Sequence, residues 1–515
     1  MALALIACAI SVKHLNEPPA YIHAWAQADN YSLALGFLHN GGDLFHPQTL
    51  ILNKQQMDPD MPLTTVTACD PPLHHYCVSL LMRLLGTTAP WVFRGWTLAV
   101  SIFGMWMLYA LAFLLARSKS KAFLAAAVCS TAPCFAYYSS SFIPTVPALS
   151  CALAGLFCYA MHLRGNSQRW LFAALAMLTL AMLQRTSLAV LWVAVACFHL
   201  LRLLRHETSW RRSWLPFSLG ALAFAAYYLW NMHLRAGYGS LFLSSLLPVQ
   251  SADQASDVLQ NVHDRWAFHY FQRLQHWLVV ALAVCVLVCM FVRRQRRQRN
   301  GALSLWWLLA IWLGGEVLFA LAMFAQYKDH DYYFLDSFFL PIVFMIVLLL
   351  AKLPDIKGKI ATAASTVVVV ALATVMTWQA IEMQELRRKE GVEALQTAVA
   401  YKSANRMFKA AGVGDNVSML ALFAYPQNTP FCMMDREGFV VMWNDTTVVN
   451  HALTFPFDVV VIEDSSFRRY FDEAPVLGRL HRIAGNDTLS LCSLADSVEN
   501  KTTEDFFRNG DNITY

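Results

Sequence analysis

The sequence predicts a polytopic α-helical membrane protein that carries a small soluble α/β domain at its C-terminal end. Of its 515 residues, 57% are hydrophobic and only 14% are charged, whereas an average soluble domain is about 45–50% apolar and about 25% charged. The apolar residues fall in runs of about 17–25, which is the length that crosses a bilayer core. Lys and Arg gather between these runs, so the net charge of +5 does not indicate nucleic-acid binding.

Eleven apolar segments are expected to be membrane helices. They are residues 1–12, 91–115, 121–138, 142–163, 169–184, 187–204, 213–234, 277–292, 303–325, 334–351 and 359–380. The first is short for a span. It is either completed by residues upstream of this Met or a signal peptide, although it lacks a basic start and a clear small-residue cleavage site.

Basic residues in alternate loops predict the orientation. Five short loops together hold seventeen Lys and Arg residues. They are Arg117, Lys119, Lys121, Arg164, Arg169, Arg202, Arg205, Arg211, Arg212, Arg293, Arg294, Arg296, Arg297, Arg299, Lys352, Lys357 and Lys359. Because short cytoplasmic loops are rich in Lys and Arg, these loops and the N-terminus are expected in the cytoplasm. The C-terminal region is then periplasmic, in what we expect to be a bacterial inner membrane.

Two domains follow from this pattern. Residues 1–380 are expected to form the membrane domain, including a long outer loop at 13–90, and residues 381–515 an extracytoplasmic α/β domain. The second domain opens with a charged helical stretch from Glu382 to Lys409. Short β-type runs separated by turn residues follow it. These runs are Val417–Phe423, Phe439–Met442 and Val459–Ile462.

Cysteine and histidine spacing does not demand a metal cofactor. Cys69 and Cys77 share the first outer loop, and Cys432 and Cys492 share the C-terminal region. Each pair can form a disulfide if these regions are outside the cytoplasm. The sequence has no CxxC or Cys/His metal spacing. A divalent metal site remains open, since outer-loop histidines accompany Asp70; these are His46, His74, His75, His263 and His269.

The outer loop at 13–90 carries the candidate catalytic acids, because it is too long to be only a connector. Helical patterns run up to His39 and up to Gly86, and the acids Asp29 and Asp70 lie near them. A carboxylate at the membrane surface can act as a general base towards an acceptor hydroxyl or amine. The alternative is that both are solvated loop acids, or that Asp29 caps a helix beginning near Asn30.

Three motifs of this region resemble the GT-C glycosyltransferases, in particular the protein O-mannosyltransferases and the lipid A aminoarabinose transferases. His23-x-Trp25-x-Gln27-x-Asp29 is similar to the H-x-W-R-Q-x-D stretch of bacterial members. Asp70-Pro71-Pro72-Leu73 and Phe93-Arg94-Gly95 are similar to later family segments. The resemblance implies that Asp29 is the catalytic base, with Asp70 as a second acid and His23 and Gln27 at the substrate. The family more often has Asp-Glu where this chain has Asp29-Asn30, which leaves the role of the second position open.

A polar turn between the ninth and tenth apolar segments completes the resemblance. Residues 326–333 read Gln-Tyr-Lys-Asp-His-Asp-Tyr-Tyr and are similar to the H-D-Y-Y segment of the family. The resemblance implies that Lys328, His330, Asp331 and Tyr332 line a site for the lipid-linked donor. The alternative is an aromatic belt with charges that extend towards the headgroups.

A departing lipid phosphate requires positive charge nearby. Arg94, Arg185 and Lys328 are the candidates, with Arg235 and Arg265 as further outer cations. Arg185 ends an apolar segment on the side that otherwise avoids basic residues. Its alternative role is an arginine paired with a carboxylate at the membrane surface.

These observations predict transfer of a sugar from a polyprenyl-phosphate donor to a protein, lipid or glycan acceptor, by inverting displacement with Asp29 as base. The alternatives are a lipid-linked-sugar flippase or transporter, an oligosaccharide ligase and a non-catalytic scaffold. A transporter would need ionisable residues within its spans, and Glu316 is the main one in this chain. Motifs for nucleotide-driven transport or ordinary hydrolases do not occur in a suitable context.

Overall fold

The computed structural model describes residues 1–52, 62–243, 245–292, 304–354, 356, 358–414, 417–497 and 502–508. The chain folds as two compact units, each described by itself below. Unit 1 comprises Met1–Leu15, Arg94–Leu229 and Ser245–Leu386, and unit 2 comprises Asn16–Phe93, Trp230–Ser244 and Arg387–Tyr515. The sequence-based division placed the loop at 13–90 with the membrane helices, whereas the structure groups most of that loop with the C-terminal region.

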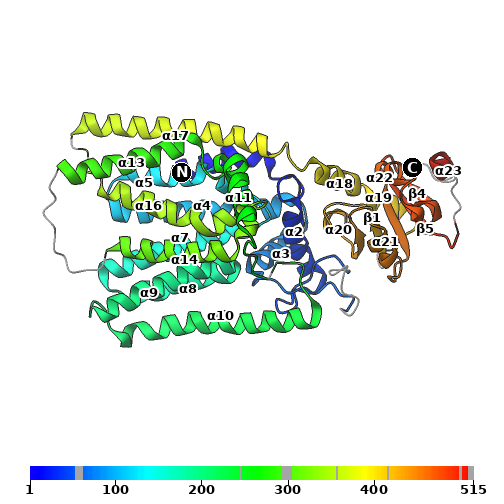
Figure 1. Cartoon of the computed structure of the whole chain (residues 1–515), viewed down its shortest axis with the longest axis horizontal. Helices are drawn as coiled ribbons and strands as arrows, with labels where there is room; N and C mark the ends of the chain where they lie inside the picture. Colours follow the sequence, from blue (N-terminus) through cyan, green and yellow to red (C-terminus); the bar gives the residue numbers. More distant parts are fainter. Residues whose placement is uncertain are drawn as a thin grey trace. The chain divides into compact units, whose positions relative to one another are not determined.

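Unit 1 is a helical bundle (Figure 1). Its helices are α1 (Ala2–Ser11), α4 (Pro90–Ala116), α5 (Lys119–Thr131), α6 (Pro133–Tyr138), α7 (Thr145–Gly165), α8 (Gln168–Gln184), α9 (Ala189–Leu204), α10 (Trp210–Tyr238), α11 (Ala252–Asn261), α12 (Ala267–Tyr270), α13 (Arg273–Val292), α14 (Leu305–Ala322), α15 (Tyr332–Phe334), α16 (Leu340–Lys352) and α17 (Lys359–Arg387). Shorter helical turns are η1 (Val12–His14), η2 (Thr186–Leu188), η3 (Val262–Trp266), η4 (Phe324–Tyr327) and η5 (Leu335–Phe339).

Each of the eleven predicted apolar segments coincides with a helix or with consecutive helices. Among the described residues, six helices are long and apolar enough to cross a membrane, or seven if the bent pair of α11–α12 and α13 is one span. The number of crossings and their orientation therefore stay predictions. Several residues used for that prediction lie outside the described part of the chain; they are Arg293, Arg294, Arg296, Arg297, Arg299 and Lys357.

One predicted segment, 121–138, is broken into two helices by a proline. Pro133 is the first residue of α6, and the preceding Ala132 is extended, with φ −61° and ψ 124°. A proline disfavours the helical conformation in the residue before it and lacks the backbone donor that would continue α5.

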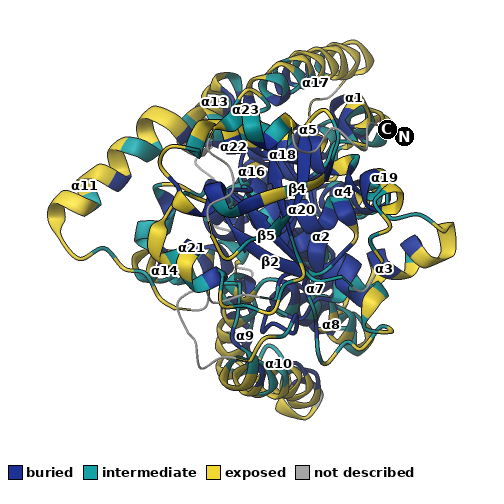
Figure 2. Ribbon diagram, turned by 90° about the vertical axis from the view of Figure 1, so that its right-hand side faces the viewer, coloured by how far each residue is buried: buried dark blue, intermediate teal, exposed yellow. Residues whose placement is uncertain are grey.

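Burial differs strongly between the helices of unit 1. Of the most apolar stretch of α7, 78% of residues are buried, whereas only 17% are buried in α17; Figure 2 shows the exposed surfaces of α10 and α17. α7 packs against α8, and α9 against α14. Gly104 of α4 allows a close approach to α7, because a Cβ there would lie 2.4 Å from Ser150 Oγ. Small residues at such contacts are typical of helix packing in membranes.

Unit 2 combines two helices from the outer loop with an α/β fold from the C-terminal region. The helices are α2 (Ala24–His39), α3 (Leu73–Leu85), α18 (Val392–Lys402), α19 (Ala404–Ala410), α20 (Thr429–Met434), α21 (Thr446–Ala452), α22 (Asp464–Tyr470) and α23 (Thr503–Arg508), with the turn η6 (Pro475–Arg479). The strands are β1 (Met419–Leu422), β2 (Gly438–Val441), β3 (Val459–Glu463), β4 (Leu480–Gly485) and β5 (Leu489–Leu494).

The sheet has the order β2-β1-β3-β5-β4. Strands β2, β1 and β3 are parallel, with Met419 opposite Gly438 and Val459, while β5 and β4 are antiparallel. The three predicted β-runs are confirmed as β1, β2 and β3. β4 and β5 were not predicted, because β4 mixes buried Leu480 with exposed His481 and lacks a continuous apolar run.

The outer loop joins this sheet at its β2 edge. Gly438 exchanges backbone hydrogen bonds with Leu50 and Leu52, at 3.1 and 2.8 Å. The charged stretch predicted as one helix from Glu382 to Lys409 is interrupted at Gly391, whose φ is +66°. A Cβ at Gly391 would lie 2.4 Å from the carbonyl oxygen of Tyr21, so this break lets the loop and the C-terminal region approach each other.

Neither of the disulfides that the sequence allowed is formed. All twelve cysteines fall within the described residues, and all are free thiols. Cys432 and Cys492 are both buried; Cys432 Sγ lies 3.7 Å from the carbonyl oxygen of Ala28 in α2. Cys69 is buried while Cys77 is exposed.

Candidate active site

Asp29 lies in the second turn of α2, with a side chain that is only 3% exposed. The helix begins at Ala24, after His23 adopts a left-handed backbone conformation with φ 55°. Asp29 is therefore inside the helix, and the alternative that it caps a helix beginning near Asn30 is wrong. A buried carboxyl group without strong partners is costly, so its surroundings decide its chemistry.

Two amide side chains from the C-terminal region hold the Asp29 carboxyl group. Asn428 Nδ2 donates to Asp29 Oδ1 at 2.7 Å, and Gln427 Nε2 approaches the same oxygen at 3.5 Å. Both residues follow the carboxyl end of β1. The carboxyl ends of parallel strands are where α/β sheets place their ligands. Sequence reasoning missed both residues, although a polar pair between two prolines after a predicted strand was a signal.

Burial raises the pKa of Asp29 to about 7, while hydrogen bonds from Asn428, Gln427 and Trp25 act in the opposite direction. Since none of these partners carries a full charge, desolvation dominates. A group with this pKa is divided between its acid and carboxylate forms near neutral pH. That is the condition in which a carboxylate works best as a general base.

Further hydrogen bonds fix the orientation of this group. Ser32 Oγ donates to Asn428 Oδ1 at 2.8 Å, so the amide nitrogen of Asn428 is turned towards Asp29. The predicted substrate-binding Gln27 is fully buried, and its Nε2 donates to the carbonyl oxygens of Ala20 and Ile22 at 3.0 and 2.9 Å. In this geometry Gln27 holds the chain that leads into α2.

Asn30, the position at which the chain departs from the family pattern, connects α2 to α3. Asn30 Nδ2 donates to Ala26 O at 2.7 Å, and Asn30 Oδ1 lies 2.8 Å from His75 Nε2. Because an amide oxygen can only accept, His75 Nε2 carries the proton. Burial lowers the pKa of His75 to about 3, so this histidine is neutral. Asn30 thus contributes a structural contact between the two helices of the outer loop.

Three aromatic rings, which we call the aromatic cluster, lie beside Asp29. They are Trp25 of α2, Tyr425 after β1 and Trp443 after β2. Ring centroids are 6.2 Å apart for Trp25 and Tyr425, 6.0 Å for Trp25 and Trp443, and 6.1 Å for Tyr425 and Trp443. Trp443 is 56% exposed. Aromatic rings with one open face bind the apolar faces of ligands.

Asp70, the second candidate acid, lies just before α3 and is half-buried. Its charge adds to burial in raising the pKa of the neighbouring Cys69 thiol. It belongs to unit 2, as do His23, Gln27 and Asp29, whereas the other predicted site residues belong to unit 1.

In unit 1 the predicted donor-site residues gather with two buried acids. Asp331 accepts from Tyr138 Oη at 2.7 Å and lies 3.5 Å from Cys134 Sγ. Asp336, which sequence reasoning missed because it lies inside an apolar segment, forms an ion pair with Arg185 and accepts from Thr145 Oγ1 at 3.0 Å. It projects from the π-helical turn η5, a distortion often found at functional sites.

Arg185 therefore has the carboxylate partner that its alternative role requires. Arg185 Nε lies 3.2 Å from Asp336 Oδ1, and its guanidinium lies 5.9 Å from the centre of the Tyr332 ring. Tyr332 also packs against Tyr138 and His330, with ring centroids 6.2 and 5.5 Å apart. Arg185, His330, Asp331 and Tyr332 are thus brought together in one polar and aromatic group.

The other two candidate phosphate-binding cations have different surroundings. Arg94 is 3% exposed; its Nη1 donates to Ser140 O at 2.8 Å, and its guanidinium lies 4.5 Å from the Phe142 ring centre. Lys328 is paired with Asp257 at 2.6 Å, which raises the pKa of the lysine. Binding of phosphate by these residues stays a prediction.

A metal-binding group does not form among the described residues, where three or more His, Cys, Asp or Glu side chains nowhere converge. The outer-loop histidines are divided, with His46, His74 and His75 in unit 2 and His263 and His269 in unit 1.

The sequence and the fold are similar to those of known membrane glycosyltransferases. The family model for dolichyl-phosphate-mannose-protein mannosyltransferases matches residues 69–230. The fold is similar to that of ArnT from Cupriavidus metallidurans, both in the apo state (TM-score 0.58, 11% identity, 95% of this chain and 96% of that chain) and bound to undecaprenyl phosphate (TM-score 0.53, 11% identity, 97% and 98%). The apo oligosaccharyltransferase of Archaeoglobus fulgidus is also similar (TM-score 0.50, 14% identity, 92% and 70%). The comparison with curated protein sequences returned no match.

The family match and the shared fold confirm the resemblance to GT-C membrane glycosyltransferases. Together they indicate that the protein is a membrane-embedded glycosyltransferase. Identities of 11–14% establish the fold only, so the roles of single residues rest on the geometry given above.

Proposed function

We propose that the protein transfers a sugar from a polyprenyl-phosphate donor to an acceptor at the outer face of the membrane, with Asp29 as the catalytic base. The observation that carries this proposal is a buried carboxyl group with a pKa of about 7, held by neutral amides beside an open aromatic cluster. An ordinary structural carboxylate would be exposed or paired with a cation.

In the proposed reaction, Asp29 accepts the proton of an acceptor hydroxyl or amine. The acceptor oxygen or nitrogen then forms a bond to the anomeric carbon of the donor sugar. The bond from that carbon to the lipid phosphate breaks, and the phosphate leaves with the electron pair. This single displacement inverts the anomeric centre.

The amides of Asn428 and Gln427 position the base. Both approach Asp29 Oδ1, so we assign proton transfer to Oδ2. Their hydrogen bonds also limit how far burial raises the pKa of Asp29. The base therefore ionises within the physiological range, where general-base catalysis is most effective.

For the donor, we assign the lipid phosphate to Arg94, Arg185 and Lys328. Positive groups stabilise the charge that develops on a leaving phosphate. Two features support the assignment: the polar and aromatic group around Arg185 in unit 1, and the similarity in fold to an ArnT structure that holds undecaprenyl phosphate. Asp336 is then a positioning residue, because it fixes the guanidinium of Arg185.

Sugar transfer by the purified protein is the direct test, with a panel of polyprenyl-phosphate sugars and wild type compared with Asp29→Asn. Asn keeps the size and polarity of the side chain but cannot accept the proton. We expect transfer to fall at least ~100-fold, with donor binding and thermal stability retained. Asp43→Asn is the matched control, because Asp43 is an exposed acid of unit 2 paired with His46.

The outcomes separate the competing functions. Transfer that persists in Asp29→Asn would move the base elsewhere, and Asp70→Asn would be tested next. Transfer only from a diphosphate-linked oligosaccharide would identify an oligosaccharide ligase. If the wild type uses none of the donors with any protein, lipid or glycan acceptor, a flippase or scaffold becomes the better description.

A further inference from the structure

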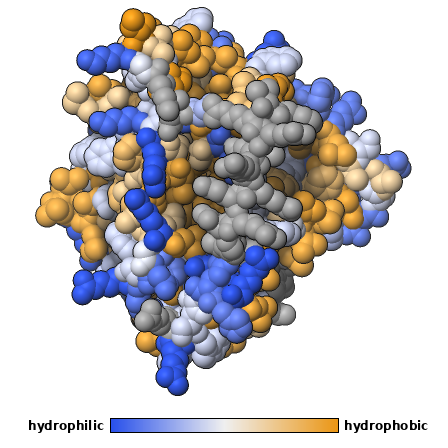
Figure 3. Space-filling view, turned by 90° about the vertical axis from the view of Figure 1, so that its left-hand side faces the viewer, coloured by the Kyte–Doolittle hydropathy of each residue, from blue (hydrophilic) through white to orange (hydrophobic). Residues whose placement is uncertain are grey.

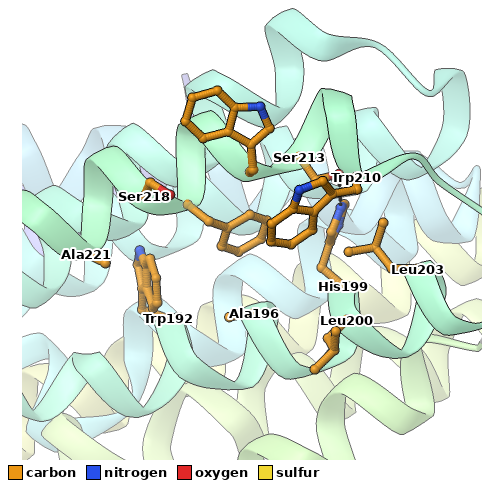
Figure 4. Close-up of a pocket in the computed structure, with 11 residues that line it drawn as sticks. Trp192, Ala196, His199, Leu200, Leu203, Trp210, Ser213, Ser218 and Ala221 are labelled. Atoms are coloured by element: carbon orange, nitrogen blue, oxygen red, sulfur yellow. Dashed lines mark hydrogen bonds between the residues drawn. The ribbon is translucent and has the colours of Figure 1, made fainter.

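A cavity of about 260 Å³ opens between α9 and α10 and follows α9 from Trp192 to Leu203. We call it the α9–α10 groove. Figure 4 shows side chains from both helices around it, among them Trp192 and His199 from α9 and Trp210 and Ser213 from α10. None of the lining residues belongs to the group around Arg185, and the length of α9 places the Leu203 end of the groove about 24 Å from Arg185.

The groove is elongated along the two helices. Its lining reaches from Leu203 back to Trp192 on α9 and from Trp210 forward to Ala221 on α10. Each stretch covers eleven residue steps, or about 16 Å at 1.5 Å per residue. This is about half of the 30 Å hydrocarbon core, and hence the depth of one leaflet. At the deep end α10 packs closely, because a Cβ at Gly220 would lie 3.1 Å from Trp192 Nε1.

Three polar residues of the lining, Trp192, His199 and Ser213, already have protein partners. His199 Nε2 lies 2.7 Å from Ser213 Oγ, which itself donates to Ser209 O at 3.0 Å. His199 Nδ1 lies 3.2 Å from Tyr159 Oη, and Trp192 Nε1 donates to Thr179 Oγ1 at 3.3 Å. These groups have their hydrogen bonds, so the groove suits an apolar chain rather than a sugar or another polar ligand.

The shallow end of the groove is positively charged. Leu203 and Trp210 flank a turn, and residues 202–212 hold four arginines against one acid, Glu207. Glu207 is itself paired with Arg202 at 3.2 Å, while Arg205 and Arg211 are exposed. Figure 3 looks onto this end of unit 1 and shows hydrophilic side chains gathered over its lower part. An apolar groove that ends in exposed arginines matches a lipid with a negative headgroup.

We propose that the α9–α10 groove binds an anionic phospholipid, with one acyl chain between the two helices and its phosphate against Arg205 and Arg211. The length of the groove matches the depth of one leaflet. The polar groups of Trp192 and His199 in its wall are already hydrogen-bonded within the protein. The arginines at its shallow end carry the charge that complements a negative headgroup. The lipid would cover the side of α10 that faces α9. This inference does not depend on the reaction that the protein catalyses.

Lipid titration of the delipidated full-length protein, followed by native mass spectrometry, tests the proposal. The ligands are phosphatidylglycerol and phosphatidylcholine with identical acyl chains, and undecaprenyl phosphate. We expect the wild type to bind phosphatidylglycerol at least ~10-fold more tightly than phosphatidylcholine. In Arg205→Gln/Arg211→Gln that preference disappears, while Ala196→Phe, which fills the groove, weakens the binding of both phospholipids.

Two matched controls distinguish binding in the groove from lipid binding elsewhere on the protein. Arg164→Gln/Arg169→Gln removes two exposed arginines from a different turn, and Ala223→Phe adds the same ring at an exposed position of α10 outside the lining. Both should bind as the wild type does. If Ala196→Phe does not fold, the arginine pair alone decides between the outcomes.

Three results would overturn the proposal. Equal phosphatidylglycerol binding by wild type and Arg205→Gln/Arg211→Gln would remove the role of the arginines. Equal losses in the Arg164→Gln/Arg169→Gln control would indicate general attraction of lipid to a basic surface. Tighter binding of undecaprenyl phosphate than of phosphatidylglycerol, lost in Ala196→Phe, would assign the groove to a polyprenyl lipid instead.

Discussion

Asp29 in unit 2 and Asp336 in unit 1 are both buried carboxyl groups, 3% and 1% exposed, but their partners differ in charge. Neutral amides from Asn428 and Gln427 surround Asp29, whereas Asp336 is paired with the guanidinium of Arg185. An amide can hold a carboxyl group in place without compensating its charge, so the group remains able to exchange a proton. An ion pair instead uses the carboxylate as a fixed counter-charge. The partner, more than burial itself, separates a candidate base from a positioning residue.

The largest expected effect is on stability, in unit 1. Asp336→Asn would leave the Arg185 guanidinium without its buried counter-charge, and breaking such a pair costs about 3–5 kcal/mol. Unfolding of the solubilised protein should therefore begin at a clearly lower temperature. Arg185→Gln/Asp336→Asn, which removes both charges, should recover part of the loss. Equal stability of Asp336→Asn and wild type would contradict the comparison.

The corresponding change in unit 2 should affect catalysis instead. Asp29→Asn is expected to reduce sugar transfer at least ~100-fold, while its melting temperature stays near that of the wild type, since no cation loses a partner. Measured together, the two variants should separate a loss of stability, in Asp336→Asn, from a loss of sugar transfer, in Asp29→Asn. A large loss of stability in Asp29→Asn would instead assign Asp29 a structural role.

The pH dependence of transfer follows from the pKa of Asp29. With a pKa of about 7, the base is mostly protonated below pH 6, so kcat/KM should rise about tenfold per pH unit there and level off above pH 8. The pH dependence of folding stability runs in the opposite direction. Because folding raises this pKa from 3.8, the folded state binds the proton more tightly, and stability falls as the pH rises from about 4 to about 7. A flat rate profile between pH 5 and pH 8 would exclude Asp29 as the base that limits the rate.

A change at Asn428 tests how far the amide partner sets the pKa of Asp29. Asn428→Leu keeps the approximate volume but removes the hydrogen bond that lowers the pKa of Asp29. A hydrogen bond to a charged group contributes about 1.5 kcal/mol or more, which corresponds to about one pKa unit. We expect the midpoint of the pH–rate profile to move upwards by about that amount. The control is Asn405→Leu, which removes an amide that donates to Met434 O. It should leave the midpoint of the pH–rate profile unchanged.

The smallest expected effect concerns the aromatic cluster. Trp443→Ala removes an exposed ring that packs against Trp25, and such contacts contribute about 0.5–1.5 kcal/mol. If the cluster contacts the acceptor, the KM for the acceptor should rise about two- to tenfold with little change in the KM for the donor. A change in the KM for the donor alone would place the ring on the donor side.

The elements predicted from sequence are those fixed by local composition. Apolar runs predicted the long helices of unit 1, but not α11 and α12, whose residues lie outside the predicted segments. The resemblance of the outer-loop motifs to a known family singled out Asp29. The residues that determine its chemistry were not predicted. Asn428 lies 399 positions away from Asp29, and no local pattern connects two residues at such a separation.

Other failures have equally physical causes. Asp336 was overlooked because the run that contains it is apolar enough to be treated as a uniform span, yet one buried charge there defines the surroundings of Arg185. The helix break at Pro133 was also missed, because hydropathy does not register the loss of a backbone donor. Strand β4 was overlooked because its alternating exposed residues resemble a loop.

The hydrogen bond from Asn428 to Asp29 also sets an order of events in synthesis. A ribosome releases α2 early, and the helices of unit 1 follow, long before the loop after β1 has been made. During all that time the Asp29 carboxyl group lacks the amide that orients it. A nascent or prematurely terminated chain would thus contain the membrane helices without a finished Asp29 site, so the proposed base is oriented only after the loop that follows β1 has been translated.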